Sequence, residues 1–378
     1  RPRPASQGGR GHHRPPDASR STSAGRAGVV MQVGAVGESE LVRRIAARFP
    51  RPSRSGEVLL GMGDDGALLR HPAGSLQVIT TDLLLEDVHF RRAWTPFDLL
   101  GHKALAVNLS DVAAMGAAPG PFFLNLGLPQ DLLLSDFDAL LDGLAGEARQ
   151  AGDIVLAGGD TCASSCLHIG VTLTGQVRPE RVIRREGGQP GDLITVSGPL
   201  GDAAAGLLLL EAGWRGSTTA AAAARPAGGP LDVPDQVATA ALAAHLRPVP
   251  CLRLGQDLGG KVSAGMDLSD GVAADLPRLC AASGCGARVE LDRIPVGAPA
   301  RALFAAVGMD APRAALAAAE DYSLLVTVTR EAWQSGLGAD HGLAIIGRLV
   351  AAREGLALLV DGVEEAWPEP GFHHFSRP

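Results

Sequence analysis

The chain has 378 residues, of which 46% are apolar and 20% are charged, and its formal net charge is −7. This composition is typical of globular proteins, and the length suffices for about two or three domains. No block of basic residues stands out, so nucleic acids and anionic membranes are not expected partners. No apolar run approaches the ~18 residues that span a bilayer.

The five cysteines favour a reducing compartment. Their number is odd, and they lack the paired spacings of zinc knuckles or of a disulfide framework. The N-terminus has no apolar segment of the signal-peptide type. We therefore expect a cytoplasmic protein with buried or incidental thiols.

The first part of the chain predicts a tail followed by an α/β domain. Residues 1–35 are expected to be a disordered tail, because the first 28 are rich in Arg, Pro, Gly and Ser. Leu41, Ile45 and Phe49 recur at helical spacing and predict a short helix. The expected elements that follow are strands at 57–60 and 76–81, a helix at 97–115, a strand at 122–128, a helix at 135–151, and strands at 153–157 and 167–177 on either side of a Gly-rich turn. They place the first domain at 36–183.

The second part, 184–378, continues the alternation of strands and helices and predicts a second α/β domain. Residues 214–234 consist mainly of Ala, Gly, Pro and Thr, so we interpret them as a low-complexity surface insertion. The expected elements are strands at 192–197, 287–291, 323–329 and 344–350, and helices after Gly201, at 236–245 and at 272–282.

The most informative residues are acids that stand beside Gly or hydroxyl residues at the ends of predicted strands. In open α/β sheets the carboxyl ends of the strands are where ligands bind. Acids that converge there need a counter-charge, and Mg²⁺ prefers a few carboxylates together with substrate phosphates. Taken singly, each Asp is also explained as a turn former or helix N-cap; together they favour a magnesium site. The acids are Asp64, Asp65, Asp82, Asp111, Asp160, Asp267 and Asp270.

Two short motifs predict how these acids reach a site. Thr80-Thr81-Asp82 ends an apolar strand, so two hydroxyls and a carboxylate are expected to emerge together. Gly158-Gly159-Asp160-Thr161 repeats this pattern at another strand end. Familiar phosphate-binding loops and protein-kinase signatures are missing, so any nucleotide site must be built differently.

The motifs in their order resemble the thiamine-monophosphate kinase family, within the superfamily of aminoimidazole ribonucleotide synthetase. The resemblance spans about residue 36 to the C-terminus. It is carried by Gly63-Asp64-Asp65, Thr80-Thr81-Asp82, His89, Lys103-Ala-Leu-Ala-Val-Asn-Leu-Ser-Asp111, Gly158-Gly159-Asp160-Thr161, Asp267-Leu-Ser-Asp270-Gly271, Glu320-Asp321-Tyr322 and Gly371-Phe372.

The resemblance implies an α/β fold of two domains, with N-terminal mixed sheets that pair in a homodimer. It implies transfer of the γ-phosphoryl group of ATP to thiamine monophosphate, with several Mg²⁺ ions. The residues that resemble magnesium ligands are Asp65, Thr80, Thr81, Asp82, Asp111, Asp160, Asp267 and Asp270. Those that resemble ATP contacts are Gly159, Asp160, Arg185 and Ser269, and those that resemble contacts to thiamine monophosphate are His89, Glu320 and Phe372.

The acceptor's chemistry explains the absence of a Ser, Cys or His catalytic constellation. A phosphate monoester has a second pKa of about 6 and is largely ionised near neutral pH, so its oxygen needs no general base. The task is to hold two anionic groups in line. We expect direct transfer without a phosphoenzyme.

One departure and two alternatives accompany this interpretation. The family has paired glycines before the glutamate at 320, whereas this chain has Ala318 and Ala319; if either needs positive φ, alanine costs roughly 1–2 kcal/mol. An aminoimidazole ribonucleotide synthetase-like enzyme and a non-catalytic nucleotide or thiamine-phosphate sensor are the competing hypotheses. The cysteines that selenophosphate synthetase and hydrogenase-maturation enzymes require are absent from their expected places.

Overall fold

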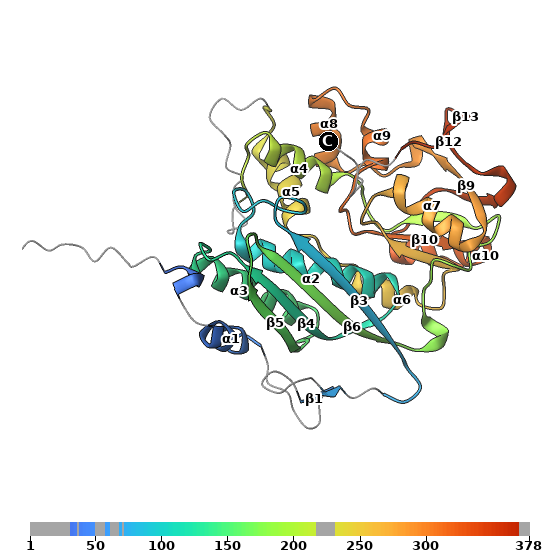
Figure 1. Cartoon of the computed structure of the whole chain (residues 1–378). Helices are drawn as coiled ribbons and strands as arrows, with labels where there is room; N and C mark the ends of the chain where they lie inside the picture. The colour runs from blue at the N-terminus through green and yellow to red at the C-terminus, as the bar shows by residue number, and fades with distance from the viewer. Residues whose placement is uncertain are drawn as a thin grey trace, which may run out of the picture. The chain divides into compact units, whose positions relative to one another are not determined.

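Two large β-sheets organise the chain (Figure 1). The computed structural model describes residues 31–35, 38–49, 57–60, 68–69, 72–216 and 231–369. Within them, a four-stranded sheet comes from the first part of the chain and a seven-stranded sheet from the second. A small third sheet pairs β1 (Val58–Leu60) with β2 (Leu68–Leu69).

The four-stranded sheet has the order β3-β6-β4-β5, in which only β4 and β5 are parallel. Figure 1 shows helices α2 and α3 running along this sheet, and α2 contacts β3, β4 and β6. The elements of this part are α1 (Glu38–Ala46), β3 (Leu76–Leu85), α2 (Phe97–Ala114), β4 (Ala118–Leu128), α3 (Leu134–Gln150), β5 (Leu156–Ala163) and β6 (His168–Val177).

The seven-stranded sheet has the order β13-β12-β9-β11-β7-β10-β8, in which only β12 and β9 are parallel. Its strands are β7 (Leu193–Val196), β8 (Ala264–Asp267), β9 (Cys285–Glu290), β10 (Leu324–Val328), β11 (Ala344–Ala351), β12 (Leu356–Val360) and β13 (Val363–Ala366). The helices are α4 (Asp202–Glu211), α5 (Asp235–Leu246), α6 (Leu252–Leu258), α7 (Val272–Ser283), α8 (Ala298–Ala306), α9 (Ala311–Leu316), α10 (Arg330–Gln334) and α11 (Leu337–His341).

Helix α2 is buried on every side from Leu100 to Ser110. It packs on α3 and on the first sheet, and it also contacts α6 and β8 from the second part of the chain. The contact with α3 depends on glycine. A Cβ on Gly101 would lie 1.9 Å from the carbonyl oxygen of Leu140, and one on Gly143 would lie 1.9 Å from that of Asp98. The two backbones therefore approach more closely than any side chain allows.

Several expectations hold. The predicted α/β class is confirmed, and α2, α3, β4 and β6 match the expected segments within a few residues.

Two expectations about strand ends need correction. Thr80-Thr81-Asp82 does not end its strand, because β3 continues to Leu85 in unbroken antiparallel pairing with β6. Gly158 and Gly159 do not form a turn, because β5 runs through them beside β4.

The edges of two low-complexity segments are also more ordered than expected. Val33, assigned to the disordered tail, lies in a 3₁₀ turn, is buried, and donates its N–H to the carbonyl of Leu132 at 2.7 Å. Trp214 and Val233, assigned to the surface insertion, are buried in the core of the second part. Apolar side chains here find tertiary partners that local composition does not reveal. Residues 1–30 and 217–230 lie outside the described ranges.

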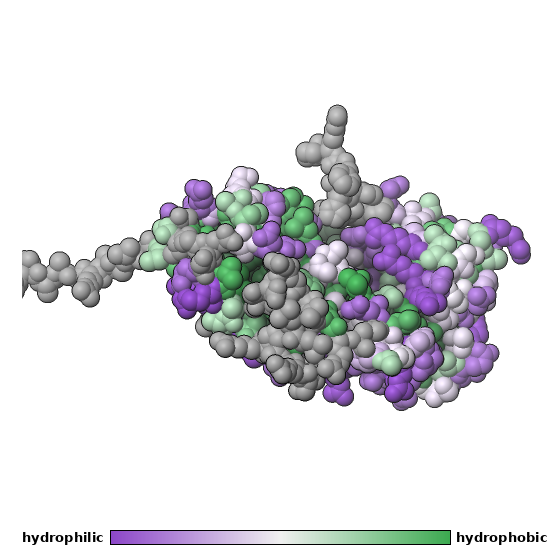
Figure 2. Space-filling view, turned by 60° about the horizontal axis from the view of Figure 1, so that its bottom comes forward, coloured by the Kyte–Doolittle hydropathy of each residue, from purple (hydrophilic) through white to green (hydrophobic). Residues whose placement is uncertain are grey.

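The described surface mixes polar and apolar residues. On the face drawn in Figure 2, apolar patches lie among hydrophilic residues. Three large apolar side chains on β3 are exposed, Leu76 at 43%, Ile79 at 64% and Leu83 at 54%. Among the described helices, none combines the length and apolar character needed to cross a membrane.

The α2–α3 contact makes a prediction about two glycines of one helix. Gly143→Ala is expected to destabilise the fold by roughly 1–3 kcal/mol or more, because its methyl group would collide with the backbone of α2. Gly146→Ala is the matched control, since its nearest neighbour is 3.9 Å away. It should stabilise the helix by about 0.5–1 kcal/mol. Urea unfolding of both variants measures the difference, and equal effects would contradict the close approach.

Candidate active site

Three of the predicted acids come together from three separate elements. Asp82 lies on β3, Asp111 on α2, and Asp267 at the last position of β8. Burial, and then the charge of Asp111, raise the pKa of Asp82 to about 6. Burial and the same Asp111 raise the pKa of Asp267 to about 7. These carboxylates therefore lie within electrostatic reach of one another although they are far apart in sequence.

Hydrogen bonds hold two of these acids in place. Thr80 donates its hydroxyl proton to Asp111 Oδ2, and Ser110 donates to Asp267 Oδ2 at 2.7 Å. Burial raises the pKa of Asp111, while the Thr80 hydrogen bond and the positive charge of Arg185 oppose that rise. Arg185 is thereby placed close to the acids. The hydrogen bond from Ser110 to Asp267 also joins α2 directly to the second sheet.

The donor set suits a hard divalent cation. Carboxylate and hydroxyl oxygens are the ligands that Mg²⁺ prefers, and a bound cation would offset the burial and the repulsion that raise the pKa values of Asp82 and Asp267. Over the described ranges, no three His, Cys, Asp or Glu side chains are already arranged as a metal cage. Magnesium usually combines one or two carboxylates with water and substrate phosphates. Asp64 and Asp65 lie outside the described residues.

Two predicted ligands are not brought to this group. Thr81 lies between Thr80 and Asp82, and successive side chains of a strand point to opposite faces. Its hydroxyl instead donates to the carbonyl of Val171 at 3.1 Å. The expectation that both hydroxyls emerge together with Asp82 is therefore wrong.

Asp160 lies at the far edge of the same sheet. Across the sheet, Asp82 on β3 pairs with Val171 on β6, and Val171 pairs with Leu124 on β4. Leu124 in turn pairs with Gly159 on β5. Asp160 is therefore about three strand spacings of ~4.8 Å from β3, and its side chain points to the other face. It is exposed, and it accepts the backbone N–H of Thr161 at 2.8 Å.

Gly159 has a packing reason to be glycine. Its φ is +155°, and a Cβ there would lie 1.8 Å from the carbonyl oxygen of Leu124 on β4. The residue is required by the close approach of two strands. The segment that sequence analysis interpreted as a Gly-rich turn is instead part of a parallel strand pair.

The segment after β8 holds the second acid of its motif. Arg278 donates to Asp270 Oδ2 at 2.6 Å and to Asp275 Oδ1 at 2.7 Å. The backbone N–H of Asp270 donates to Asp275 Oδ2 at 3.0 Å. Ser269, between the two motif acids, accepts the backbone N–H of Glu320 at 2.8 Å. Asp275 was missed by sequence analysis, because nothing in the motif marks it.

Two predicted substrate contacts lie near each other. Nδ1 of His89 accepts the backbone N–H of Leu85 at 3.1 Å, which assigns the ring proton to Nε2 in the neutral form. Burial alone would raise the pKa of Glu320, but the charge and the hydrogen bond of Lys103 lower it, and His89 acts in the same direction. His89 is therefore within electrostatic reach of Glu320. Phe372 lies outside the described residues.

Backbone strain near Glu320 falls on unexpected positions. Glu320 has φ +65° and Tyr322 has φ +50°, whereas Ala318 and Ala319 are not among the positive-φ residues of the described chain. Ala318 and Ala319 therefore do not pay the energetic cost of a positive φ. The strain of roughly 1–2 kcal/mol per residue lies at the two residues that follow.

Asp321, between those two residues, binds the start of helix α4. Its two carboxylate oxygens accept the N–H of Gly201 at 3.0 and 2.9 Å. Burial nevertheless raises the pKa of Asp321 to about 7, against the effect of these hydrogen bonds. Gly201 has φ +92° and is followed directly by α4.

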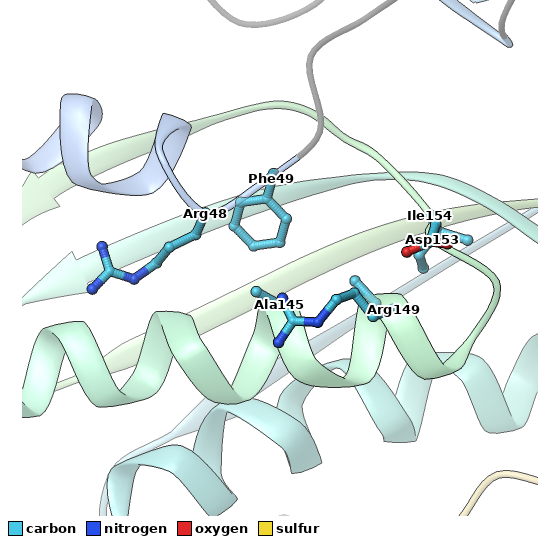
Figure 3. Close-up of a pocket in the computed structure, with 7 residues that line it drawn as sticks. Arg48, Phe49, Ala145, Arg149, Asp153 and Ile154 are labelled. Atoms are coloured by element: carbon cyan, nitrogen blue, oxygen red, sulfur yellow. The ribbon is translucent and has the colours of Figure 1, made fainter.

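A pocket elsewhere in the molecule does not coincide with these residues. It lies between the end of α1 and the C-terminal part of α3 (Figure 3). Its volume is about 170 Å³. Its lining residues are Arg48, Phe49, Ala145, Ala148, Arg149, Asp153 and Ile154. None of the predicted site residues lines it, so we do not assign it to the candidate active site.

The chain is similar to known proteins over most of its length. Residues 63–177 match the family model described as AIR synthase related protein, N-terminal domain, and residues 189–358 match the corresponding C-terminal domain. The thiamine-monophosphate kinase of Salmonella typhimurium is 37% identical over 352 residues, which cover 91% of this chain and 100% of that protein.

Two solved structures are also similar to this chain in fold. The thiamine-monophosphate kinase of Stenotrophomonas maltophilia has a TM-score of 0.70 and 36% identity, over 87% of this chain and 98% of that one. AaThiL complexed with AMPPCP and TMP has a TM-score of 0.68 and 28% identity, over 90% and 98%.

The raised pKa of Asp321 predicts a pH dependence. The folded value of about 7 exceeds the ordinary Asp value near 3.9, so the folded state binds this proton more tightly. Its stabilising contribution is full below about pH 4 and is lost as the pH rises through about 7. The side chain of Asp321→Asn stays neutral at every pH. The difference in free energy of unfolding, wild type minus Asp321→Asn, should therefore fall by about 1–3 kcal/mol between pH 5 and pH 8.

Denaturant titrations at several pH values measure this difference, in which acids common to both proteins cancel. Asp292→Asn is the matched substitution at an exposed carboxylate. A difference between wild type and Asp321→Asn that stays constant with pH would contradict the prediction.

Proposed function

This chain belongs to the thiamine-monophosphate kinase family, and we propose that it transfers the γ-phosphoryl group of ATP to thiamine monophosphate. The products are thiamine diphosphate and ADP. The observation that carries this proposal is the convergence of Asp82, Asp111 and Asp267 beside Arg185. Acids from β3, α2 and β8 meet where a polyanionic substrate and its cations can bind.

Magnesium is the cation that fits this oxygen-rich set. The residues that would hold it are Asp82, Asp111, Asp267 and Asp270, together with Asp65 and the hydroxyl of Thr80. Bound Mg²⁺ supplies positive charge to the phosphate oxygens and lowers the repulsion between two anionic reactants. Asp270 must then exchange its bond to Arg278 for a cation or keep it and act through that arginine.

The chain's own residues have to position the reactants. The acceptor phosphate is largely ionised near neutral pH, so no side chain is needed to remove a proton from it. Arg185 lies close enough to Asp111 to lower its pKa, and its guanidinium is suited to a phosphate oxygen of ATP. His89 lies within electrostatic reach of Glu320, and both side chains are suited to the thiamine end of the acceptor. Phe372 remains a proposed ring contact.

The alternatives are less well supported. The identity to thiamine-monophosphate kinases extends over nearly the full length of those proteins, which disfavours an aminoimidazole ribonucleotide synthetase-like enzyme. A non-catalytic sensor would not require several buried carboxylates whose pKa values are raised, because burying them opposes folding near neutral pH.

We also propose that the enzyme is a homodimer in which the four-stranded sheets pair. Both β3 and β5 are edge strands, and β3 exposes Ile79 and Leu83 on the face opposite Asp82. Exposed strand edges with apolar side chains favour pairing with another chain. If β3 meets the β5 edge of the other subunit, Asp160 of the partner subunit lies about one strand spacing from the Thr80-Thr81-Asp82 segment of β3, closer than Asp160 of the same chain.

We place the domain division near residue 184, since β3 to β6 form one sheet and β7 to β13 another. We propose a cytoplasmic location, in keeping with five free cysteines.

The proposed reaction is tested by incubating the protein with ATP, Mg²⁺ and thiamine monophosphate. We expect equimolar ADP and thiamine diphosphate, and loss of both when a chelator removes Mg²⁺. Asp111→Asn should reduce turnover roughly 100-fold or more, because it removes a carboxylate that would hold Mg²⁺ against the phosphates. Asp292→Asn is the matched exposed control. Absence of thiamine diphosphate with Mg²⁺ present, or full activity of Asp111→Asn in a folded protein, would contradict the proposal.

Shared sites predict complementation between two inactive variants. Asp82→Asn and Asp160→Asn should each lose activity as pure dimers. In a mixed dimer, one site would contain both substitutions and the other neither. Exchange of subunits should thus restore about a quarter of the wild-type activity, since half of the dimers are mixed and each has one intact site. No recovery, with mixed dimers confirmed by mass spectrometry, would contradict a shared site.

A further inference from the structure

Lys103 is a buried cation in the middle of α2. Only 2% of its side chain is exposed, and it is among the largest fully buried side chains of the described chain. Lysine is rarely buried without a partner, because desolvating its charge is costly. The partner is Glu320, whose Oε2 accepts from Lys103 Nζ at 3.0 Å. This pair joins α2 to the loop before β10.

A third group, His245 on α5, lies beside the same carboxylate oxygen. Its Nδ1 is 3.2 Å from Glu320 Oε2 but makes no hydrogen bond there. Burial, and then the charge of Lys103, lower the pKa of His245 to about 4, so the imidazole is neutral near pH 7. Lys103 is therefore the counter-charge of Glu320, and His245 packs beside the pair.

The backbone of this loop is fixed independently of the side chain. Glu320 donates its N–H to the carbonyl of Ser269 at 2.8 Å, and Tyr322 donates to that of Leu268 at 2.9 Å. Both donors have positive φ, which is rare for residues with side chains. Strained residues persist where surrounding contacts hold them, and they concentrate at binding sites. The loop is therefore fastened to the segment that carries Asp267 and Asp270.

Glu320 keeps one oxygen for another partner. Its contacts to Lys103 and His245 both use Oε2, and no residue within the described ranges pairs with Oε1. The side chain remains 24% exposed. A carboxylate with one oxygen anchored and one accessible is a directed acceptor for a ligand N–H group.

We propose that Lys103 is a positioning residue of the acceptor subsite, which anchors Glu320 Oε2 so that Oε1 accepts a hydrogen bond from the thiamine moiety. The inference rests on the proposed kinase function. Lys103 itself does not touch the substrate. It acts through Glu320, and it keeps the acceptor's ring end at a fixed distance from the acids further along the same helix.

Steady-state kinetics of Lys103→Met, Glu320→Gln and the double variant test this role. Lys103→Met should raise KM for thiamine monophosphate at least tenfold, while kcat and KM for ATP change less than threefold. The double variant should be no worse than Glu320→Gln alone, because Lys103 acts through that carboxylate. Lys103→Arg should recover part of the loss. Unchanged KM for thiamine monophosphate, equal changes for both substrates, or additive effects would overturn the inference.

The chain's other lysine supplies the control. Lys261 is exposed between α6 and β8, and Lys261→Met should leave all kinetic constants unchanged. An active wild type with an unaffected Lys103→Met variant rejects this inference and leaves the kinase function standing. A wild type that yields no thiamine diphosphate rejects the kinase function itself.

A chemical measurement tests the pair without turnover. Because Lys103 and Lys261 are the only lysines, an amine-reactive ester reports on each by peptide mass spectrometry. Lys103 should react at least tenfold more slowly than Lys261 in wild type, and faster in Glu320→Gln than in wild type. Equal reactivity of the two lysines in the folded wild type would overturn the buried pair.

Discussion

The structure depends on a helix that is buried on all sides yet carries polar and charged residues. From Leu100 to Ser110, α2 has no solvent-facing side, so each polar group on it requires a partner from a neighbouring element. Lys103 finds Glu320 and Ser110 finds Asp267, both from the second part of the chain. The need to satisfy these groups thus joins the two sheets at the place where the acids gather.

Long elements of the fold could be predicted from sequence, and short or closely paired ones could not. Helices α2 and α3 have the length and apolar content that identify a helix locally. Strand β8, with the sequence Ala-Gly-Met-Asp, has neither length nor alternation, and only its pairing with β10 makes it a strand. At Gly158 and Gly159, the local preference for a turn gave way to pairing with β4.

The site shows a similar division. Sequence alone included Asp82, Asp111 and Asp267 in a set of seven candidate metal ligands, because these acids stand beside hydroxyl or glycine residues at the ends of predicted strands. It could not say which face of a strand each side chain uses. The register places the side chain of Thr81 on the face of the sheet opposite to that of Asp82. It places Asp160 on the other edge strand of the sheet. The partners His245 and Asp275 carry no local signal, since they matter only through tertiary contacts.

The geometry of α2 connects the two ends of the proposed acceptor. Lys103 and Asp111 are eight residues apart on one continuous helix, which corresponds to a rise of about 12 Å. Near Asp111 the helix faces a cluster whose carboxylates have raised pKa values, and near Lys103 it faces a carboxylate whose pKa is lowered. The first environment favours added cations and their phosphates. In the second, the carboxylate already has its counter-charge, so it can select a ligand by hydrogen bonding instead of by net charge. A rigid helix that carries both environments fixes their separation, and an acceptor with a phosphate at one end and an amine-bearing ring at the other is matched to that spacing.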